Sequence, residues 1–331
     1  MMMFFDLASF GNLVYYVLYD AFDSSLAMIP IPPELHLSPA SGSIRPLTLP
    51  RDRSDGAGGY EMAVMSREIV PPGEEGGDHT YDGVLYTWTP SATVLPPVCT
   101  WQVSGRPVFP QIVKDEAFFV ECMFCFQGKL FFGDLTLGLV CCDLPTSTSN
   151  SKNAISLYFI PLPPGVYATL RWETNNLEDT DWMDRNRTIG CAQGLIKLVC
   201  IDRSAGRPAD VKLSVWTLDV SIKQWNKDHE FRAVQLWKWF GFRKKGLPET
   251  PPKCPVLMPD GSITFLIPRL CMTEKDPIED YICNVDLNRM KFGWSGEPDT
   301  CSYRTPIVVP GNFFAMVTPP LNVTVRTGIF I

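Results

Sequence analysis

Residues 128–144, GKLFFGDLTLGLVCCDL, constrain the fold of this chain more than any other stretch. Two short apolar segments, residues 130–134 and 139–143, are typical of β-strands. The residues between them, 135–138, end in Gly138, which can adopt the positive φ that a tight hairpin turn requires. The stretch therefore predicts one β-hairpin of a sheet. A similar pattern recurs loosely along the chain: an apolar strand ending in Asp or Thr, a polar turn, and a return strand with a large aromatic residue.

The recurrence of this pattern favours an all-β fold. Hairpin ends lie at or near Asp20, Thr89, Asp143, Asp219 and Asp286. The chain has 30 prolines, which cannot donate hydrogen bonds into a sheet and therefore indicate many loops and short strands. We expect a single domain over residues 1–331, a β-propeller-like array of small antiparallel sheets with roughly five to six blades and an incomplete first blade. Two packed β-sandwiches are the alternative.

Further strands are predicted where apolar runs lie between turn signals: residues 12–20, 25–29, 60–65, 84–89, 98–104, 195–202, 211–219, 263–267, 281–286 and 290–294. Residues 31–59 and 66–80 are interrupted by Pro and Gly and are predicted to be flexible loops. One short helix is predicted over residues 234–240, ended by Gly241. Strand-like runs between residues 313 and 327 are expected to pair with the first strands and close a ring.

Composition narrows the class of protein. A hydrophobic content of 45% is ample for a core, and the net charge of −7 argues against general affinity for a nucleic-acid backbone. The 11 cysteines are an odd number, and several, such as Cys141, Cys200 and Cys283, lie in apolar strands, which indicates a reducing compartment. The apolar N-terminus lacks a basic region, and no uncharged run is long enough to span a membrane. We expect a cytoplasmic or nuclear protein that is neither secreted nor embedded in a membrane.

Motifs for catalysis, cofactors or metals are weak in this sequence. There is no G-x-S-x-G, no G-x-G-x-x-G and no Walker loop, so we expect no catalytic set and no cofactor. The one C-x-x-C, Cys122 and Cys125, lies in an apolar strand, where residues three apart point to opposite faces. Cys141 and Cys142 also point apart. Buried thiols are therefore favoured over a zinc site, and we expect no metal.

The carboxylates leave an enzyme alternative open. A hydrolase could use acids at the mouth of a propeller, and this requires two or more of Asp134, Asp143 and Asp286 to converge. The only histidines, His36, His79 and His229, are widely separated in the sequence, and nothing nearby would orient an imidazole.

Residues 236–248, LWKWFGFRKKGLP, combine aromatic and basic side chains. Candidate interaction residues in this stretch are Trp237, Trp239, Arg243, Lys244 and Lys245. Rings next to cations can stack on nucleic-acid bases or lie at a membrane surface, whereas rings at the end of a short helix usually pack in a core. Core packing of the aromatic residues is the favoured interpretation, with nucleic-acid binding through residues 236–245 as the weaker alternative.

Six segments in this order resemble a family of plant proteins: residues 19–33, 128–144, 159–165, 187–202, 213–225 and 246–257. The family is the grass-expanded domain of unknown function 1618 (DUF1618), and the resemblance covers residues 19–294. Gly133 stands where this family often has a bulkier residue. The resemblance implies a plant source, a propeller-like β fold and no established activity, so no functional residues are carried over from it.

The function expected from these observations is that of a non-enzymatic protein-interaction scaffold with an unidentified protein partner. Propellers commonly present variable loops on a rigid repeated frame, and binding residues concentrate in such loops. A carboxylate-based hydrolase is the first alternative, and nucleic-acid binding is the second.

Overall fold

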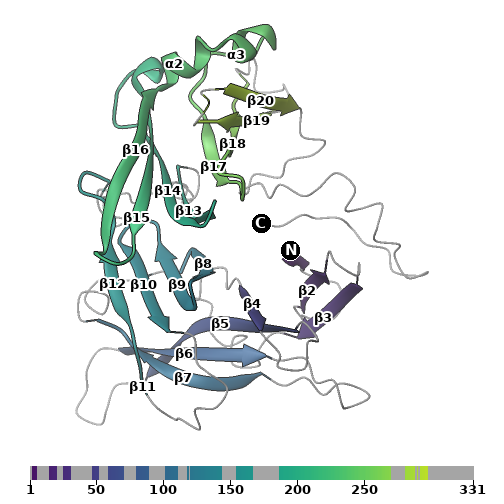
Figure 1. Ribbon diagram of the computed structural model, residues 1–331, viewed down its shortest axis with the longest axis vertical. Coiled ribbons are helices and arrows are strands. Elements are labelled where there is room, and N and C mark those ends of the chain that lie inside the picture. The colour runs from purple at the N-terminus through teal and green to yellow at the C-terminus, as the bar shows by residue number, and fades with distance from the viewer. Residues whose placement is uncertain are drawn as a thin grey trace. The chain divides into compact units, whose positions relative to one another are not determined.

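The computed structural model of the chain consists almost entirely of β-strands (Figure 1). It describes residues 2–5, 15–20, 25–30, 47–51, 59–70, 80–88, 101–110, 118, 120–143, 154–166, 186–269, 280–287, 289 and 291–296. These residues form five small sheets and divide into two compact units. One unit holds the strands up to Phe159, and the other holds the turn at 135–138 and the described residues from Ile160 onward.

The first two sheets lie in the first unit. One sheet has three antiparallel strands: β1 (Met2–Phe5), β2 (Tyr15–Asp20) and β3 (Ser25–Pro30). The next has five strands: β4 (Leu47–Arg51), β5 (Gly59–Val70), β6 (Thr80–Trp88), β7 (Gln102–Val108) and the short β11 (Ala154–Ser156), which runs parallel to β7. Strand β4 and the end of β5 occupy parts of the stretches 31–59 and 66–80, for which the sequence predicted loops.

The third sheet contains the hairpin predicted for residues 128–144. Its strands are β8 (Cys122–Phe126), β9 (Lys129–Asp134), β10 (Gly138–Asp143) and β12 (Tyr158–Pro161). The predicted hairpin is confirmed, and Gly138 has the expected positive φ of +150°. A side chain at Gly138 would also overlap the backbone of Ile160 and lie 2.9 Å from the Cα of Pro161. Only glycine therefore fits this turn.

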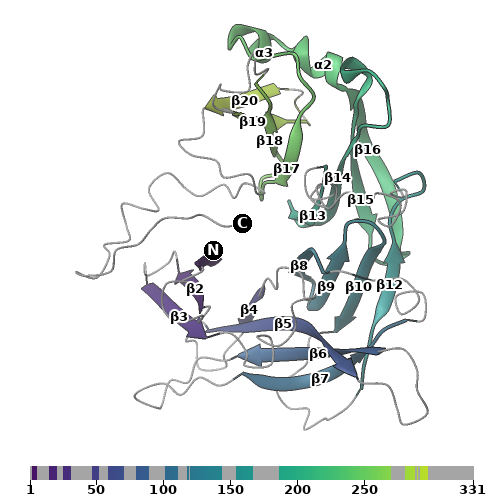
Figure 2. The same cartoon turned by 180° about the vertical axis from the view of Figure 1, so that it is seen from behind.

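Two four-stranded sheets make up most of the second unit, and each is an antiparallel meander in chain order (Figures 1 and 2). The first has β13 (Arg187–Ala192), β14 (Leu195–Asp202), β15 (Lys212–Asp219) and β16 (Gln224–Arg232). The second has β17 (Lys253–Leu257), β18 (Ile263–Ile267), β19 (Tyr281–Asp286) and β20 (Lys291–Gly296). The near-continuous apolar run of β14 predicted a strand covered on both faces, and its inner residues are all buried.

One apolar core joins these two sheets. Val199, Leu213 and Phe231 contribute from the first, and Phe265 and Val285 contribute from the second. Each such side chain stabilises the fold by about 2 kcal/mol when it is removed from water. The first strands of the two sheets, β13 and β17, also lie in contact. The pair of sheets is therefore one packed body.

Helix is nearly absent from the described residues. A 3₁₀ turn, η3 (Pro208–Asp210), precedes β15, and two one-turn helices, α2 (Ala233–Trp237) and α3 (Phe240–Lys244), follow β16 (Figures 1 and 2). The prediction of a single helix ended by Gly241 is wrong. Gly241 lies inside α3, where an added Cβ would be 2.5 Å from the Cβ of Phe292, so this glycine allows close packing on β20.

The all-β class with small, mainly antiparallel sheets is confirmed. The runs predicted between residues 313 and 327 lie outside the described residues. No helix in the described stretches has the length and apolar character that a membrane span requires.

Candidate functional site

Two of the acids proposed for a hydrolase, Asp134 and Asp143, lie at opposite ends of one hairpin. Asp134 is fully buried at the end of β9. Asp143 is exposed at the end of β10 and forms an ion pair with Lys129 at the start of β9. The two carboxylates are therefore separated by the length of the strand, roughly 16 Å at the rise of a β-strand. Glycosidases hold their two acids within about 10 Å, so this pair does not form such a site.

The acids at hairpin ends in the second unit serve as turn caps. Asp286 Oδ1 accepts a hydrogen bond from the backbone N–H of Arg289 at 3.1 Å. In the same way, Asp219 and Asp260 accept hydrogen bonds from the backbone N–H groups two residues later, at 3.0 and 2.9 Å. The hydroxyls of Ser221 and Ser262 also donate to these carboxylates and lower the pKa of each. These acids stabilise turns, as Asp commonly does.

The other predicted metal or catalytic groups remain dispersed. Within the described ranges, no three His, Cys, Asp or Glu side chains come together in a way that could hold a metal ion. Cys122 and Cys125 lie at the two ends of β8, and the Cys122 thiol faces the backbone oxygen of Gly133 at 3.9 Å. His229 lies on β16, while His36 and His79 are outside the described residues.

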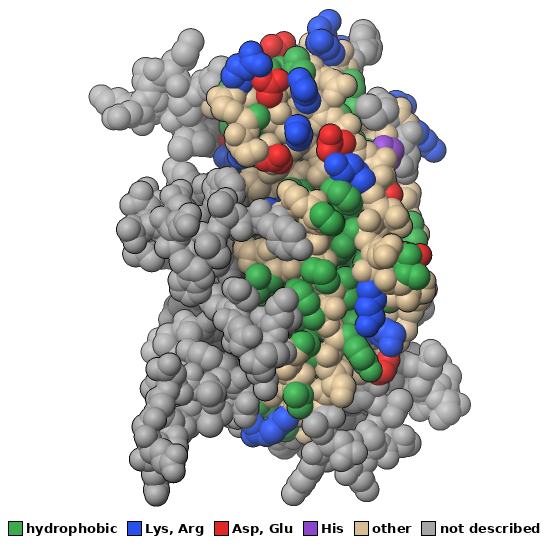
Figure 3. Space-filling view, turned by 90° about the vertical axis from the view of Figure 1, so that its left-hand side faces the viewer, with side chains coloured by type: hydrophobic (Ala, Val, Ile, Leu, Met, Phe, Trp, Pro, Cys, Tyr) green, Lys and Arg blue, Asp and Glu red, His purple; other side chains and the backbone are tan. Residues whose placement is uncertain are grey.

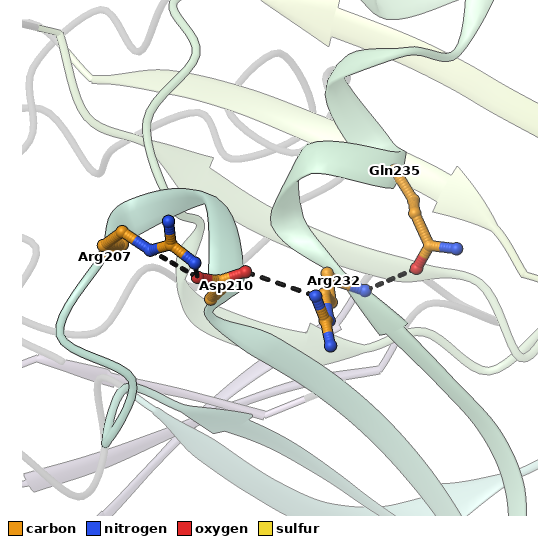
Figure 4. Close-up of polar contacts among 4 residues, drawn as sticks. All are labelled: Arg207, Asp210, Arg232 and Gln235. Atoms are coloured by element: carbon orange, nitrogen blue, oxygen red, sulfur yellow. Dashed lines mark hydrogen bonds and ion pairs between the residues drawn. The ribbon is translucent and has the colours of Figure 1, made fainter.

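The candidate interaction residues lie on α2, α3 and the residues beside them. The backbone N–H of Arg232 donates to the side-chain oxygen of Gln235 at 2.7 Å and so caps the start of α2 (Figure 4). Asp210, in η3, pairs with Arg207 at 2.7 Å and with Arg232 at 3.3 Å. This cluster joins the beginning of β15 to the beginning of α2.

The aromatic candidates pack in the core. Trp237 is 6% exposed, and its indole N–H donates to the backbone oxygen of Thr250 at 3.1 Å. The ring of Trp239 lies 5.8 Å from that of Phe231 and is partly buried against the same core. Phe242 is buried with its ring edge-on to Phe292, at 6.2 Å. These rings anchor α2 and α3 to both sheets, as the packing interpretation of the sequence predicted.

The basic candidates lie on the outside of the same segment. We use the name basic segment for the exposed cations Arg232, Lys238, Arg243, Lys244 and Lys245. The sequence has no acid between Phe231 and Pro248. Figure 3 shows several Lys and Arg side chains, with some Asp and Glu among them, at the top of the view, where α2 and α3 lie. The structure thus separates the five sequence candidates into anchoring rings and exposed cations.

The sequence analysis missed one buried polar cluster. Lys197, on β14, is almost buried and pairs with Asp228 of β16 at 3.5 Å. The hydroxyl of Thr217 donates to the same carboxylate at 2.5 Å. Asp228 occupies the extra position of a β-bulge, since Val215 pairs with His229 and Trp216 with Lys227. A lysine inside the apolar run LIKLVCID was the available signal.

The fold and this surface define an all-β protein that carries a compact, core-anchored basic segment. Residues 134–265 match the family model of the proteins of unknown function named DUF1618, which confirms the resemblance over this stretch. The match includes β13 to β16, both helices and the basic segment.

The other comparisons with known proteins do not indicate a function. No curated protein matches the sequence. One solved structure with some likeness is the xylan beta-1,4-xylosidase from Bacillus halodurans C-125, at 11% identity and a TM-score of 0.34. The match covers 90% of this chain and 57% of the xylosidase, so the chain spans less than two thirds of that protein. Similarity at this level carries no argument about fold or activity.

Proposed function

We propose that this protein is a non-enzymatic interaction scaffold and that the basic segment is its main contact surface for a protein partner. The observation that carries the proposal is the division of roles within one short segment. Trp237 and Phe242 are buried in the core of the second unit, whereas Arg243, Lys244 and Lys245 beside them are exposed. A surface held in place by its own core loses little conformational entropy on binding, which favours recognition.

The hydrolase alternative has less support. It needs paired acids, but Asp134 and Asp143 are at opposite ends of their hairpin and Asp286 caps a turn. A turn-capping carboxylate is held against the backbone of its own turn, which leaves it poorly placed to act together with a second acid.

We further propose that the sheets are successive blades of a β-propeller. Each sheet of the second unit is a meander, and the first strands of neighbouring sheets are in contact in both units, β4 with β8 and β13 with β17. Contact between first strands is the arrangement expected around a propeller axis. A crystal structure tests this directly: blades around one axis support it, and two stacked sandwiches contradict it.

We also infer an intracellular location, in the cytosol or nucleus. Cys142, Cys200 and Cys283, on β10, β14 and β19, are buried and form no disulfide. Unpaired buried thiols persist where glutathione keeps cysteine reduced. Fluorescent-fusion imaging in plant cells tests this inference, and secretion into the medium would contradict it.

Comparative affinity capture tests the scaffold proposal. The bait is the full chain, and the source is a plant extract, as the family resemblance implies. One variant carries Arg243→Ala, Lys244→Ala and Lys245→Ala. The matched control removes three other exposed cations by Lys223→Asn, Arg289→Ala and Lys291→Ala, with Asn at Lys223 because its φ is +54°.

We expect at least one protein that the wild type and the control retain and that the basic-segment variant loses. The native fold of each variant is checked by circular dichroism and thermal unfolding. A partner bound equally by all three baits would place the contact elsewhere on the scaffold. Capture of nothing above a denatured-bait background would contradict the scaffold proposal itself.

A further inference from the structure

We infer that the basic segment binds an acidic peptide segment of the partner, rich in Asp and Glu and extended in conformation. This inference rests on the proposed function and names the chemistry of the partner. It is carried by the charge of the segment, by its anchoring, and by the burial of the rings that another class of ligand would need.

The charge of the segment is opposite to that of the protein. The chain has a net charge of −7, whereas residues 232–248 hold five cations and no acid. Arg232 shares the carboxylate of Asp210 with Arg207, and both guanidinium groups keep exposed faces, with 59% and 83% of their side chains accessible. Within the described part of the chain, no carboxylate pairs with Lys238, Arg243 or Lys245. Lys238, Arg243 and Lys245 therefore offer positive charge that no described carboxylate compensates.

The cations are presented at two places along a bent backbone. Lys238 lies at the junction between α2 and α3, and Arg243, Lys244 and Lys245 lie at the end of α3. The N–H of Lys245 donates to the backbone oxygens of Gly241 and Phe242, both at 3.3 Å, so the last turn is closed. In an extended peptide, side chains on one face recur every two residues. A peptide with a carboxylate at every second residue can therefore place several carboxylates beside these spaced cations.

Nucleic acid is a poorer fit for the same surface. Single strands bind where exposed aromatic rings stack on bases beside cations. Here the rings of Trp237 and Phe242 are 6% and 1% exposed, and Trp239 packs on Phe231. Among the described side chains of the segment, the cations are therefore exposed while the rings of Trp237 and Phe242 are not available for stacking.

An anionic membrane is disfavoured for a related reason. Peripheral helices bind membranes by inserting apolar side chains while their cations contact headgroups. Leu236 and Trp237 of α2 and Phe242 of α3 are buried in the core, so these side chains are not available for insertion into a membrane. A carboxylate-rich peptide requires neither stacking nor insertion, and so its chemistry matches the surface.

Fluorescence anisotropy with a labelled peptide tests the inference. The probe is an alternating Glu-Gly peptide of about twelve residues, which spans roughly 40 Å when extended. Comparison probes are a Gln-Gly peptide of the same length, a single-stranded oligonucleotide and vesicles with anionic lipid. The proteins are the full chain, the basic-segment variant Arg243→Ala, Lys244→Ala and Lys245→Ala, and the control Lys223→Asn, Arg289→Ala and Lys291→Ala.

The wild type and the control should bind the Glu-Gly peptide with Kd values within about twofold of each other. The basic-segment variant should bind about tenfold more weakly, since three exposed charge pairs each contribute modestly. Binding should weaken as salt rises, and the Gln-Gly peptide should not bind. Equal affinity in all three proteins would overturn the inference, as would tighter binding of the oligonucleotide or the vesicles.

The capture experiment distinguishes failure here from failure of the proposed function. If a partner depends on the basic segment but the Glu-Gly peptide does not bind, the acidic-peptide inference is wrong and the scaffold remains. If the capture experiment and the peptide assay both show no binding, the scaffold proposal and the acidic-peptide inference are both wrong.

Discussion

The guanidinium of Arg203 donates a hydrogen bond from Nη2 to the backbone oxygen of Pro252 at 2.5 Å. Its Nε donates to the side-chain oxygen of Asn186 at 2.7 Å. Arg203 follows β14, whereas Pro252 precedes β17, so this side chain ties the two sheets of the second unit together. The turn of Gln193 makes a second link, because its backbone N–H donates to the oxygen of Pro259.

Replacing Arg203 by Met should destabilise the protein by about 2 kcal/mol, because a charged donor is lost from two acceptors while the volume is kept. Urea unfolding followed by tryptophan fluorescence measures this change. Arg207→Met is the control, since the Arg207 side chain is 83% exposed, and it should change stability by less than about 0.5 kcal/mol. Equal effects of the two substitutions would show that Arg203 does not join the sheets.

Gly133→Ala should cost about 1–3 kcal/mol of stability, because the new methyl group would overlap the Cys122 thiol and lie 3.1 Å from Leu139. Thermal unfolding measures the cost, and Gly206→Ala is the control because nothing lies within 4 Å of its added Cβ. Cys122→Ala should recover part of the loss in the double variant. An unchanged stability of Gly133→Ala would mean that β8 moves freely to accommodate a side chain.

The Asp219 carboxylate should respond to the loss of one hydroxyl. Hydrogen bonding from the Ser221 side chain is the main reason that the pKa of Asp219 is lowered. Because the folded-state pKa lies below the unfolded value, this group stabilises the fold above about pH 4, and the stabilisation is lost as the pH falls through the folded pKa. Ser221→Ala should raise the pKa of Asp219 in a carboxyl NMR titration, and Ser262→Ala should leave it unchanged. A pKa that stays low in Ser221→Ala would assign the shift to the backbone donors instead.

Alkaline conditions should destabilise the protein through its buried thiols. Burial raises the pKa of Cys142 and of Cys283 to about 12. A raised thiol pKa means that the unfolded chain releases its proton first, so stability falls as the pH rises from about 8.5 toward 12. Alkylation at pH 9 followed by mass spectrometry should leave both thiols unmodified in the native protein and modify them in urea. Modification of either thiol without urea would contradict its burial.

Local signals were sufficient for most strands, with β4 and the end of β5 as exceptions, but not for the contacts between strands. The hairpin of β9 and β10 follows from two apolar runs and one glycine, which are adjacent in sequence. The extent of α3 does not follow from local sequence. Gly241 lies within this helix because it packs closely against Phe292, which belongs to a strand far along the chain. Propensity alone treats glycine as a helix end, and tertiary packing overrides it here.

The candidate surface was predictable in composition but not in arrangement. The sequence placed Trp237 and Lys244 in one stretch, and only packing against β13 to β20 separates the buried ring from the exposed cation. The pair of Lys197 and Asp228 depends on a bulge in β16, which is a property of strand register. The local sequence marks Lys197 as a cation in an apolar strand, but it does not show the register that brings Asp228 to it.

Site-specific photo-crosslinking tests the central claim most directly. A photoreactive amino acid replaces Lys244 in one protein and Lys291 in another, both exposed positions in the second unit. Irradiation in a plant extract, followed by mass spectrometry, identifies what lies against each position. The scaffold proposal predicts a protein crosslinked at position 244 through an acidic segment and absent at position 291. Crosslinks at position 291 alone, or at neither position, would contradict the assignment of the basic segment as the contact surface.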